Sequence, residues 1–165
     1  MLDEVTAALK TADVIIDMMR RRGHALVSNE RHVEGTVFVL DFDNQHTAIL
    51  LQRGDVNKDM IDMVLRHFDV RRLMVVYSGK LTPSAAQLLH LAEVWNDNEL
   101  RCNPFQFNFV RDAVIVDPPP LHASHLPKLL TTDPLCRYLG AKVGDVVRVE
   151  ISHQTKERVV VEKAS

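Results

Sequence analysis

The stretch Leu126–Val149, LPKLLTTDPLCRYLGAKVGDVVRV, carries the clearest local signals in the chain, and it predicts a compact strand–helix–turn–strand unit. Thr132 or Asp133 offers a short oxygen side chain that can accept hydrogen bonds from the free N–H groups of a first helical turn. Pro134 then takes the first helical position, where its missing N–H group has no cost. We therefore predict a short helix that begins at Pro134.

Two glycines mark where this helix and the turn after it end. Gly140 stands where helices commonly close with a left-handed residue, and Gly144 lies in the turn that follows. The β-branched run at 146–149 then begins a strand. Residues at i, i+3 and i+4 give the helix one apolar face: Leu135, Tyr138 and Leu139. The unit thus has a side that can pack on a sheet.

The same stretch matches a known family block, which runs Leu-Pro, then Asp-Pro with Arg-Tyr-x-Gly, then Gly-x-Val-Val and a basic residue. Eleven positions match in order and spacing: Leu126, Pro127, Asp133, Pro134, Arg137, Tyr138, Gly140, Gly144, Val146, Val147 and Arg148. The stretch resembles the assembly domain of the fifth shared small subunit of eukaryotic nuclear DNA-directed RNA polymerases, a family that also has archaeal members. The resemblance implies a shortened, divergent member with a small C-terminal α+β assembly domain.

The resemblance also implies which residues dock this domain onto other subunits or support it structurally. They are Asp133, Pro134, Arg137, Tyr138, Gly140, Gly144 and Arg148. The tail departs from the family pattern at Ile151, Glu157 and Val159, although the β-branched runs 146–151 and 158–161 still predict a hairpin. An edge strand of that hairpin could add to the sheet of a partner.

Residues 1–80 predict a small sheet covered by helices. Apolar residues spaced by three and four predict a helix from Leu2 to the basic run Arg20–Arg22, with Gly23 as its stop. Asn57 caps a second predicted helix. Strands are predicted at residues 25–28, 35–42, 47–51 and 72–77. Since the second helix lies between the last two strands, we expect those strands to be parallel.

This element order is shared with nucleases of the restriction-endonuclease type. Their chemistry needs one acid, then a second acid and a lysine on the next strand, to hold a divalent metal and polarise water. Asp41 could supply the first acid, but Thr47–Gln52 contains neither an acid nor a lysine. An active nuclease is therefore disfavoured. The resemblance implies instead an N-terminal nuclease-like jaw domain without an active site.

Residues Lys80–Ala85, KLTPSA, resemble the Thr-Pro-Ser-Ala signature at the end of the family's jaw domain. Thr82 can cap a helix that has Pro83 at its first position and continues over 85–92. In the family this loop lies beside downstream DNA, and free helical N–H groups together with Lys80 would suit a phosphate. The resemblance implies four DNA-proximal residues: Lys80, Thr82, Pro83 and Ser84. A good helix start without a DNA role is the alternative.

The polar segment Trp95–Glu99 predicts a break in the chain, and we place the domain boundary near residues 93–100. This gives a jaw domain at 1–95 and an assembly domain at 96–165, and we expect the chain to be of the α/β (α+β) class. Alternating aromatic residues after the boundary predict a half-buried strand, with stacking on single-stranded bases as the alternative: Phe105, Phe107 and Phe109.

Composition limits the classes of function. The 165 residues are 46% hydrophobic with a formal charge of −2, which suits a packed fold but not a free-standing, strongly basic DNA-binding protein. Cys102 and Cys136 do not make a disulfide framework, so the composition indicates an intracellular protein. His122 and His125 lack the further ligands of a zinc site. No apolar run approaches the roughly 18 residues that cross a bilayer, so we expect no membrane partner.

The resemblance implies a non-catalytic subunit of a multisubunit DNA-directed RNA polymerase, and we expect no catalytic residue, cofactor or metal in this chain. The resemblance implies that it docks on the largest subunit, meets other polymerase subunits and forms part of the lower jaw near downstream duplex DNA. A nuclease-like DNA-processing enzyme and a free-standing protein-interaction module remain as alternatives. We expect an intracellular location, which is the nucleus for a cellular polymerase, or the virion or a cytoplasmic viral factory for a viral one.

Overall fold

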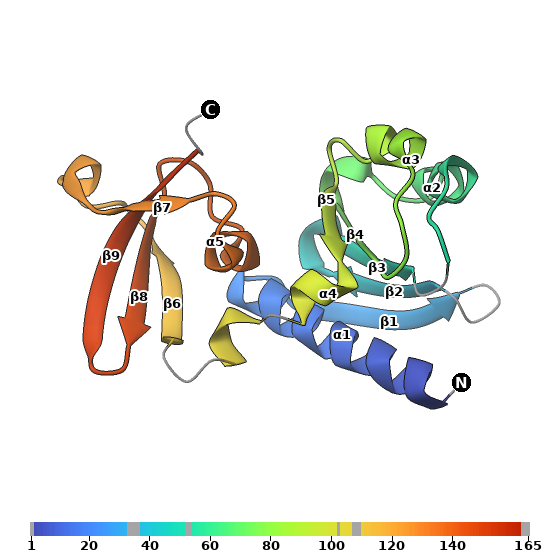
Figure 1. Ribbon diagram of the computed structural model, residues 1–165, viewed down its shortest axis with the longest axis horizontal. Coiled ribbons are helices and arrows are strands. Elements are labelled where there is room, and N and C mark those ends of the chain that lie inside the picture. The colour runs from blue at the N-terminus through green and yellow to red at the C-terminus, as the bar shows by residue number, and fades with distance from the viewer. Residues whose placement is uncertain (1, 33–36, 52–53, 102, 107–109, 163–165) are drawn as a thin grey trace. The chain divides into compact units, whose positions relative to one another are not determined.

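The computed structural model describes residues 2–32, 37–51, 54–101, 103–106 and 110–162. The chain forms two compact units, Met1–Arg101 and Cys102–Ser165, which we call the N-terminal and C-terminal units (Figure 1). Each unit has its own β-sheet with helices beside it, and the predicted α+β class is confirmed. The division falls at Arg101, just after the segment where we placed the boundary.

The N-terminal unit is built on a five-stranded sheet with the order β1-β2-β3-β4-β5. The strands are β1 Leu26–His32, β2 Val37–Phe42, β3 Thr47–Leu51, β4 Leu73–Tyr77 and β5 Glu93–Asn96. Strand β2 pairs antiparallel with both β1 and β3, whereas β4 pairs parallel with both β3 and β5. The predicted crossover between the third and fourth strands is therefore confirmed.

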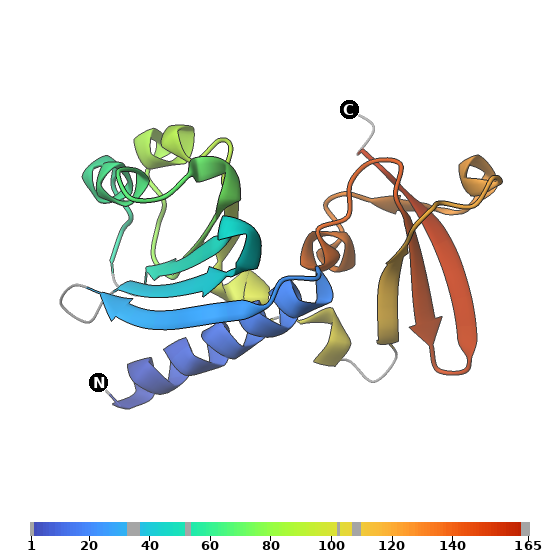
Figure 2. The ribbon, with the colours of Figure 1, turned by 180° about the vertical axis from the view of Figure 1, so that it is seen from behind.

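Helices cover both faces of this sheet, as Figures 1 and 2 show from opposite sides. They are α1 Leu2–Arg21, α2 Lys58–Leu65, α3 Pro83–Leu88 and α4 Asp97–Leu100. On one face α2 and α3 pack against the sheet through Ile61, Val64 and Ala85, and on the other α1 buries Ile15 and Met18. Every residue of β3 is buried, because a central strand covered on both faces has no polar side.

Most of the predicted elements of this unit are confirmed. Helix α1 ends at Arg21 before Gly23, whose φ is +87°, and Asn57 caps α2 through a bond from the Met60 N–H. The first strand runs on to His32 rather than stopping at 28. Helix α3 ends at Leu88, although we expected helix to residue 92.

The prediction of a polar break at Trp95–Glu99 is wrong. Trp95 belongs to β5 and is buried, with 3% of its surface exposed. Asn96 then caps α4, and the Glu99 side chain accepts from the Asn96 N–H to complete a capping box. Polar residues were mistaken for a linker because helix caps use the same residue types as loops.

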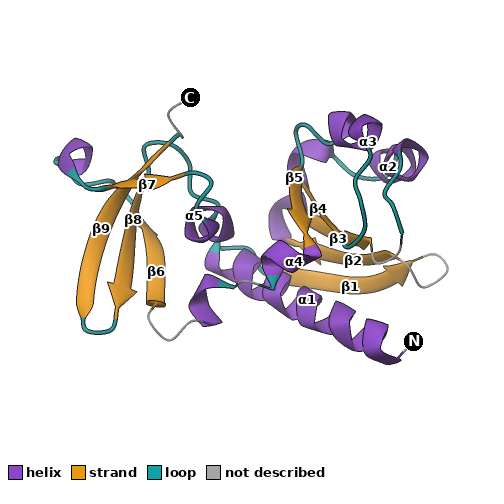
Figure 3. Ribbon diagram, viewed as in Figure 1, coloured by secondary structure: helices purple, strands orange, loops and turns teal. Residues whose placement is uncertain are grey.

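The C-terminal unit consists of a four-stranded sheet and one α-helix among its described residues (Figure 3). The strands are β6 Val110–Val116, β7 Lys128–Leu130, β8 Val146–Ile151 and β9 Gln154–Val161, and the helix is α5 Pro134–Leu139. The sheet order is β6-β8-β9-β7, with β7 parallel to β9. The buried face of α5 packs on this sheet, against Ala113, Val149 and Val160.

Two expectations for this unit need correction. Phe105 lies in the 3-10 helix Pro104–Gln106 rather than in a strand, and Phe107 and Phe109 lie outside the described residues. The predicted hairpin exists as β8 and β9, but both are inner strands of the described sheet. In the described sheet β7 pairs only with Val159–Val161, so the part of β9 from Gln154 to Arg158 is the one stretch of the hairpin that lies at an edge where a partner strand could add.

Candidate functional site

The block around α5 folds as its residue types dictate. The Asp133 carboxylate accepts from the Leu135 N–H at 2.8 Å, and Pro134 occupies the first helical position. Gly140 ends the helix with φ +68°, and the Ala141 N–H bonds to the Cys136 carbonyl at 2.9 Å. This left-handed closure satisfies the last free carbonyls of the helix. The helix thus begins and ends at the residues that its caps predict.

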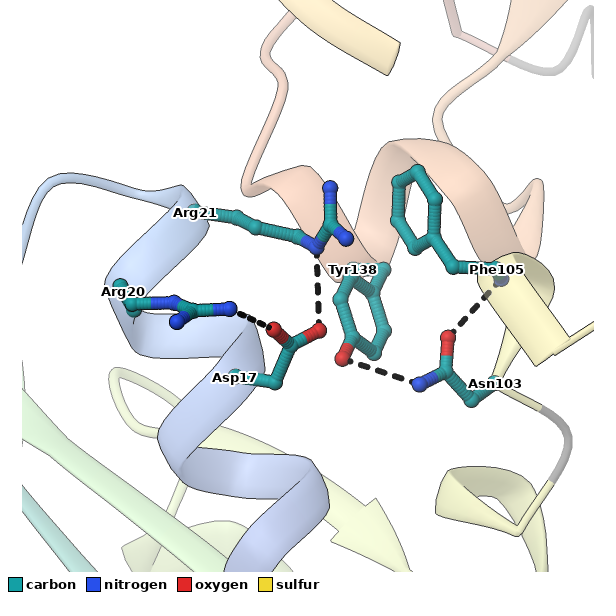
Figure 4. A network of polar contacts seen from close by, with 6 residues as sticks. All are labelled: Asp17, Arg20, Arg21, Asn103, Phe105 and Tyr138. Carbon is teal, nitrogen blue, oxygen red and sulfur yellow. Dashed lines mark hydrogen bonds and ion pairs between the residues drawn. The ribbon is translucent and has the colours of Figure 1, made fainter. Parts of the chain in front are cut away.

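Tyr138 is held inside the C-terminal unit by two neighbours that precede the sheet in sequence. Its hydroxyl oxygen accepts from the Asn103 side-chain amide at 3.2 Å, and its ring lies 5.3 Å from that of Phe105. Asn103 also accepts from the Phe105 N–H at 2.9 Å, as Figure 4 shows. Tyr138 is therefore a packing residue with a satisfied hydroxyl group rather than an exposed contact.

The turn around Gly144 is tied to β9 by main-chain bonds. The Gly144 N–H bonds to the Val160 carbonyl at 3.0 Å, and the Val160 N–H bonds back to Asp145 at 2.8 Å. The Asp145 carboxylate also accepts from the Lys142 N–H at 2.7 Å. With φ +93° at Gly144, this turn needs glycine. It leaves Val143 exposed by 56%.

Arg148 is paired within its own sheet. It lies opposite Glu157 in the register of β8 and β9, and its Nε and Nη2 reach Glu157 Oε1 at 2.9 and 2.8 Å. The Arg148 side chain is 48% exposed. Glu157 is one of the positions where the sequence departs from the family pattern, and it supplies the charge that neutralises Arg148 here.

Cys136 is a buried thiol on the inner side of α5. It has 0% exposed surface and packs in the core cluster of the C-terminal unit. Burial, with smaller effects of Asp133 and Asp145, raises its pKa to about 11. The thiol is therefore neutral near pH 7 and has no nucleophilic role. Cys102 lies outside the described residues.

The four DNA-proximal candidates lie at the start of α3. Thr82 caps this helix, with its hydroxyl oxygen 3.4 Å from the Ala85 nitrogen, and Pro83 follows at the first helical position. Lys80, Pro83 and Ser84 are exposed, whereas Thr82 is half-buried. The Asp55 carboxylate accepts from the Lys80 N–H at 3.2 Å, so a negative charge lies close to this basic residue.

The loop at residues 54–56 contacts the segment that carries these candidates. The sequence alone gave no sign of this contact. Val56 and Leu81 form a parallel bridge, with the Val56 N–H bonded to the Lys80 carbonyl at 2.7 Å. A Cβ atom on Gly79 would lie 1.9 Å from the carbonyl oxygen of Gly54. Gly79 is thus required by space rather than by its φ angle, and only contact between distant loops could show it.

The basic run at the end of α1 is partly neutralised within the N-terminal unit. Asp17 accepts from Arg20 at 2.7 Å and from Arg21 at 3.0 Å (Figure 4). Arg22 forms a two-pronged ion pair with Glu93 at 2.6 and 2.7 Å. Two carboxylates thus offset part of the charge of three arginines, and the Arg20 side chain stays 75% exposed.

Asp41 does not resemble a nuclease ligand in its surroundings. Its two carboxylate oxygens accept from the hydroxyl groups of Thr47 at 2.9 Å and Ser28 at 3.1 Å.

No group of three metal-ligating side chains occurs among the described residues. His125 lies in the 3-10 helix Ala123–His125, and His122 lies directly before it. No helix in the described part of the chain is long and apolar enough to cross a membrane.

The block around α5 is similar in sequence to known proteins. Residues 118–161 match the family described as RNA polymerase Rpb5, C-terminal domain. Over 93% of its length the chain is 22% identical to DNA-directed RNA polymerase subunit 5-like protein 1 of Arabidopsis thaliana, of which 92% is covered. Over 24% of its length it is 38% identical to DNA-directed RNA polymerase subunit Rpo5 of Methanothrix thermoacetophila, of which 51% is covered. Residues 118–161 are thus similar to the Rpb5 C-terminal domain, and the chain as a whole is similar to a curated RNA polymerase subunit 5-like protein over most of its length.

Proposed function

We propose that this chain is a non-catalytic subunit of a DNA-directed RNA polymerase, which docks on the largest subunit through its C-terminal unit. The match of residues 118–161 to the Rpb5 C-terminal domain carries this proposal, because that segment contains the whole capped helix, turn and hairpin. The N-terminal unit would then form part of the lower jaw beside downstream duplex DNA. Its cellular location would be that of the polymerase.

The proposed docking surface lies on the outer side of the Asp133–Arg148 block. Most motif side chains in this block face inward or cap the helix, so they support docking by fixing its shape. The turn at Val143 offers an exposed apolar side chain in the same block. Burying such a side chain against a partner removes apolar surface from water and would favour assembly.

For the jaw role, the braced loop at Lys80 is the supporting feature. Lys80 and Ser84 are exposed on a loop that main-chain bonds hold to Val56. An ammonium group and a hydroxyl group can contact phosphate oxygens without reading base sequence. The negative charge of Asp55 beside Lys80 should weaken a contact between Lys80 and a DNA phosphate. We therefore expect this contact to form only in the assembled enzyme.

Purification of the complex tests the subunit role. A tagged chain expressed in its native cells should recover a stable complex with two very large polypeptides that has RNA polymerase activity. Val143→Asp should reduce recovery of those polypeptides, whereas Lys80→Ala should leave recovery unchanged and weaken binding to downstream DNA. Recovery of the chain alone would favour a free-standing interaction module. Metal-dependent cleavage of DNA by the isolated chain would favour the nuclease alternative.

A further inference from the structure

Two histidines that the proposed polymerase role does not use stack beside the turn between β2 and β3. His24 precedes β1 and His46 precedes β3, and their rings stack with centroids 4.2 Å apart and planes inclined by 29°. His24 Nδ1 lies 3.2 Å from a carboxylate oxygen of Asp43. His46 Nδ1 lies 3.4 Å from the Asn44 carbonyl oxygen. The two rings thus link the start of β1 to the turn.

The same turn is held from two other sides. The Arg72 guanidinium donates to the Asn44 carbonyl at 3.0 Å and to Gln45 Oε1 at 2.6 Å. The Asp43 N–H bonds to the Ala25 carbonyl at 2.9 Å. Asn44 and Gln45 both have positive φ, at +54° and +63°. Left-handed conformations at two successive non-glycine residues cost energy, so these contacts are needed to hold the turn.

The stability of the His24–His46 stack depends on the charges of the two rings and of the groups around them. The charged or titratable groups that face the His46 ring are His24, Arg72 and Asp43. Burial lowers the pKa of His46, with further lowering by His24 and Arg72, while the Asn44 carbonyl and Asp43 act in the opposite direction. If both rings were protonated, two imidazolium groups and one guanidinium would share a single carboxylate. Like charges at this separation repel.

We propose that the His24–His46 stack is a proton-sensitive latch that holds the Asp43–Gln45 turn against β1 and Arg72, and that double protonation opens it. Since the folded state disfavours the proton on His46, the stabilising contribution is present above the ordinary histidine value of about 6.5. It is lost as pH falls below that value towards the lower pKa of the folded state. The turn lies where β3 and β4 begin, so opening would loosen the sheet at the end opposite the Lys80 loop.

Amide hydrogen exchange in the full chain tests the latch. We expect the protection factor of the Asp43 amide to fall as pH is lowered from about 7.5 to about 5, by up to about tenfold per pH unit for each extra proton that the open form binds. His46→Gln should remove this pH dependence. His90→Gln, which changes an exposed histidine of the same unit, should retain it. A protection factor that stays constant in the wild type, or falls equally in His46→Gln, would overturn the proposal.

A second measurement needs no variant. In the wild-type chain, the nuclear magnetic resonance titration of the His46 ring should give a pKa below about 6.5. The carbon signals of the Asn44–Gln45 backbone should change together with protonation of His46. A pKa for His46 at or above that value would also overturn the latch.

Discussion

The block around α5 and the loop at Lys80 are positioned by different kinds of contact. In the α5 block, caps and turns join residues close in sequence, as between Asp133 and Leu135. The Lys80 loop is instead held by residues about 25 positions away, through the Val56–Leu81 bridge and the Gly54–Gly79 approach. Contacts of the first kind can be predicted from sequence motifs. Contacts of the second kind cannot, because nothing around Gly79 in the sequence shows that it approaches Gly54.

This difference agrees with where similarity to known proteins is strongest. The family match covers the α5 block and its hairpin, where local caps fix the shape. A block that folds by local signals can tolerate change elsewhere in the chain. Four substitutions test the difference between the two regions through protein stability, from the largest expected effect to the smallest.

Tyr138→Ala should give the largest loss, on the order of 3 kcal/mol of unfolding free energy, because it removes a buried ring from Phe105. Chemical denaturation with a probe in the C-terminal unit would measure it. Tyr138→Phe is the matched control, and it should cost only about 1 kcal/mol through loss of the bond from Asn103. Equal losses of unfolding free energy in the two variants would show that packing of the ring is not the main contribution of Tyr138 to stability.

Gly79→Ala should destabilise the N-terminal unit by roughly 2 kcal/mol, because the new methyl group meets the Gly54 carbonyl oxygen and both loops must shift. Thermal unfolding and amide exchange at Val56 would report the change. Gly23→Ala serves as a control, since no atom lies within 4 Å of its Cβ position and only its positive φ is unfavourable. An unchanged protection factor at Val56 would show that the two loops are not coupled.

Gly140→Ala should cost about 1 kcal/mol, because an alanine there must adopt the left-handed conformation that closes α5. Denaturation curves of the C-terminal unit would measure the loss. Gly140→Asn should recover part of it, since asparagine tolerates this region better than alanine does. If asparagine were no better than alanine, backbone conformation would not be the cause.

Arg148→Ala should have the smallest effect, under about 1 kcal/mol, because the Arg148 side chain in its ion pair with Glu157 is 48% exposed. Glu157→Gln should cost equally little, and the double variant should cost no more than either single one. Double-mutant analysis of unfolding free energies would measure the coupling. A strong loss of polymerase assembly in Arg148→Ala with normal stability would show that Arg148 also meets a partner.

The elements that the sequence predicted well share one property, which is that their signals are local. Asn57 and Thr82 were assigned as helix caps, and Thr132 and Asp133 were the two candidates for α5, of which Asp133 is the cap. Strand β5 was missed because it has only four residues, of which Trp95 is buried through neighbours distant in sequence. The segment Asn96–Glu99 contains a capping box that we interpreted as part of a polar break between the domains.

For the candidate site, the sequence located both regions but not how their side chains are used. Arg148 was expected to serve docking, and the sheet register places it opposite Glu157. Asn103, which donates to the Tyr138 hydroxyl oxygen, lies 35 residues away from it in sequence. A contact over that distance leaves no local sequence motif, so the sequence analysis did not find it. The surfaces that meet other subunits and DNA stay predictions, and the proposed variants test them.

By itself, the sequence determined the local units: the amphipathic α1, the capped helices and the Gly140–Gly144 turn block, which lies within the segment similar to the Rpb5 C-terminal domain. Local hydrogen bonds and hydrophobic periodicity suffice for these, because both act between near neighbours. Only the tertiary structure decided the strand order, the inner position of the β8–β9 hairpin and the approach of Gly54 to Gly79. The stacking of His24 on His46 belongs to the same group. These features depend on which distant segments pack together, and packing is set by the whole core.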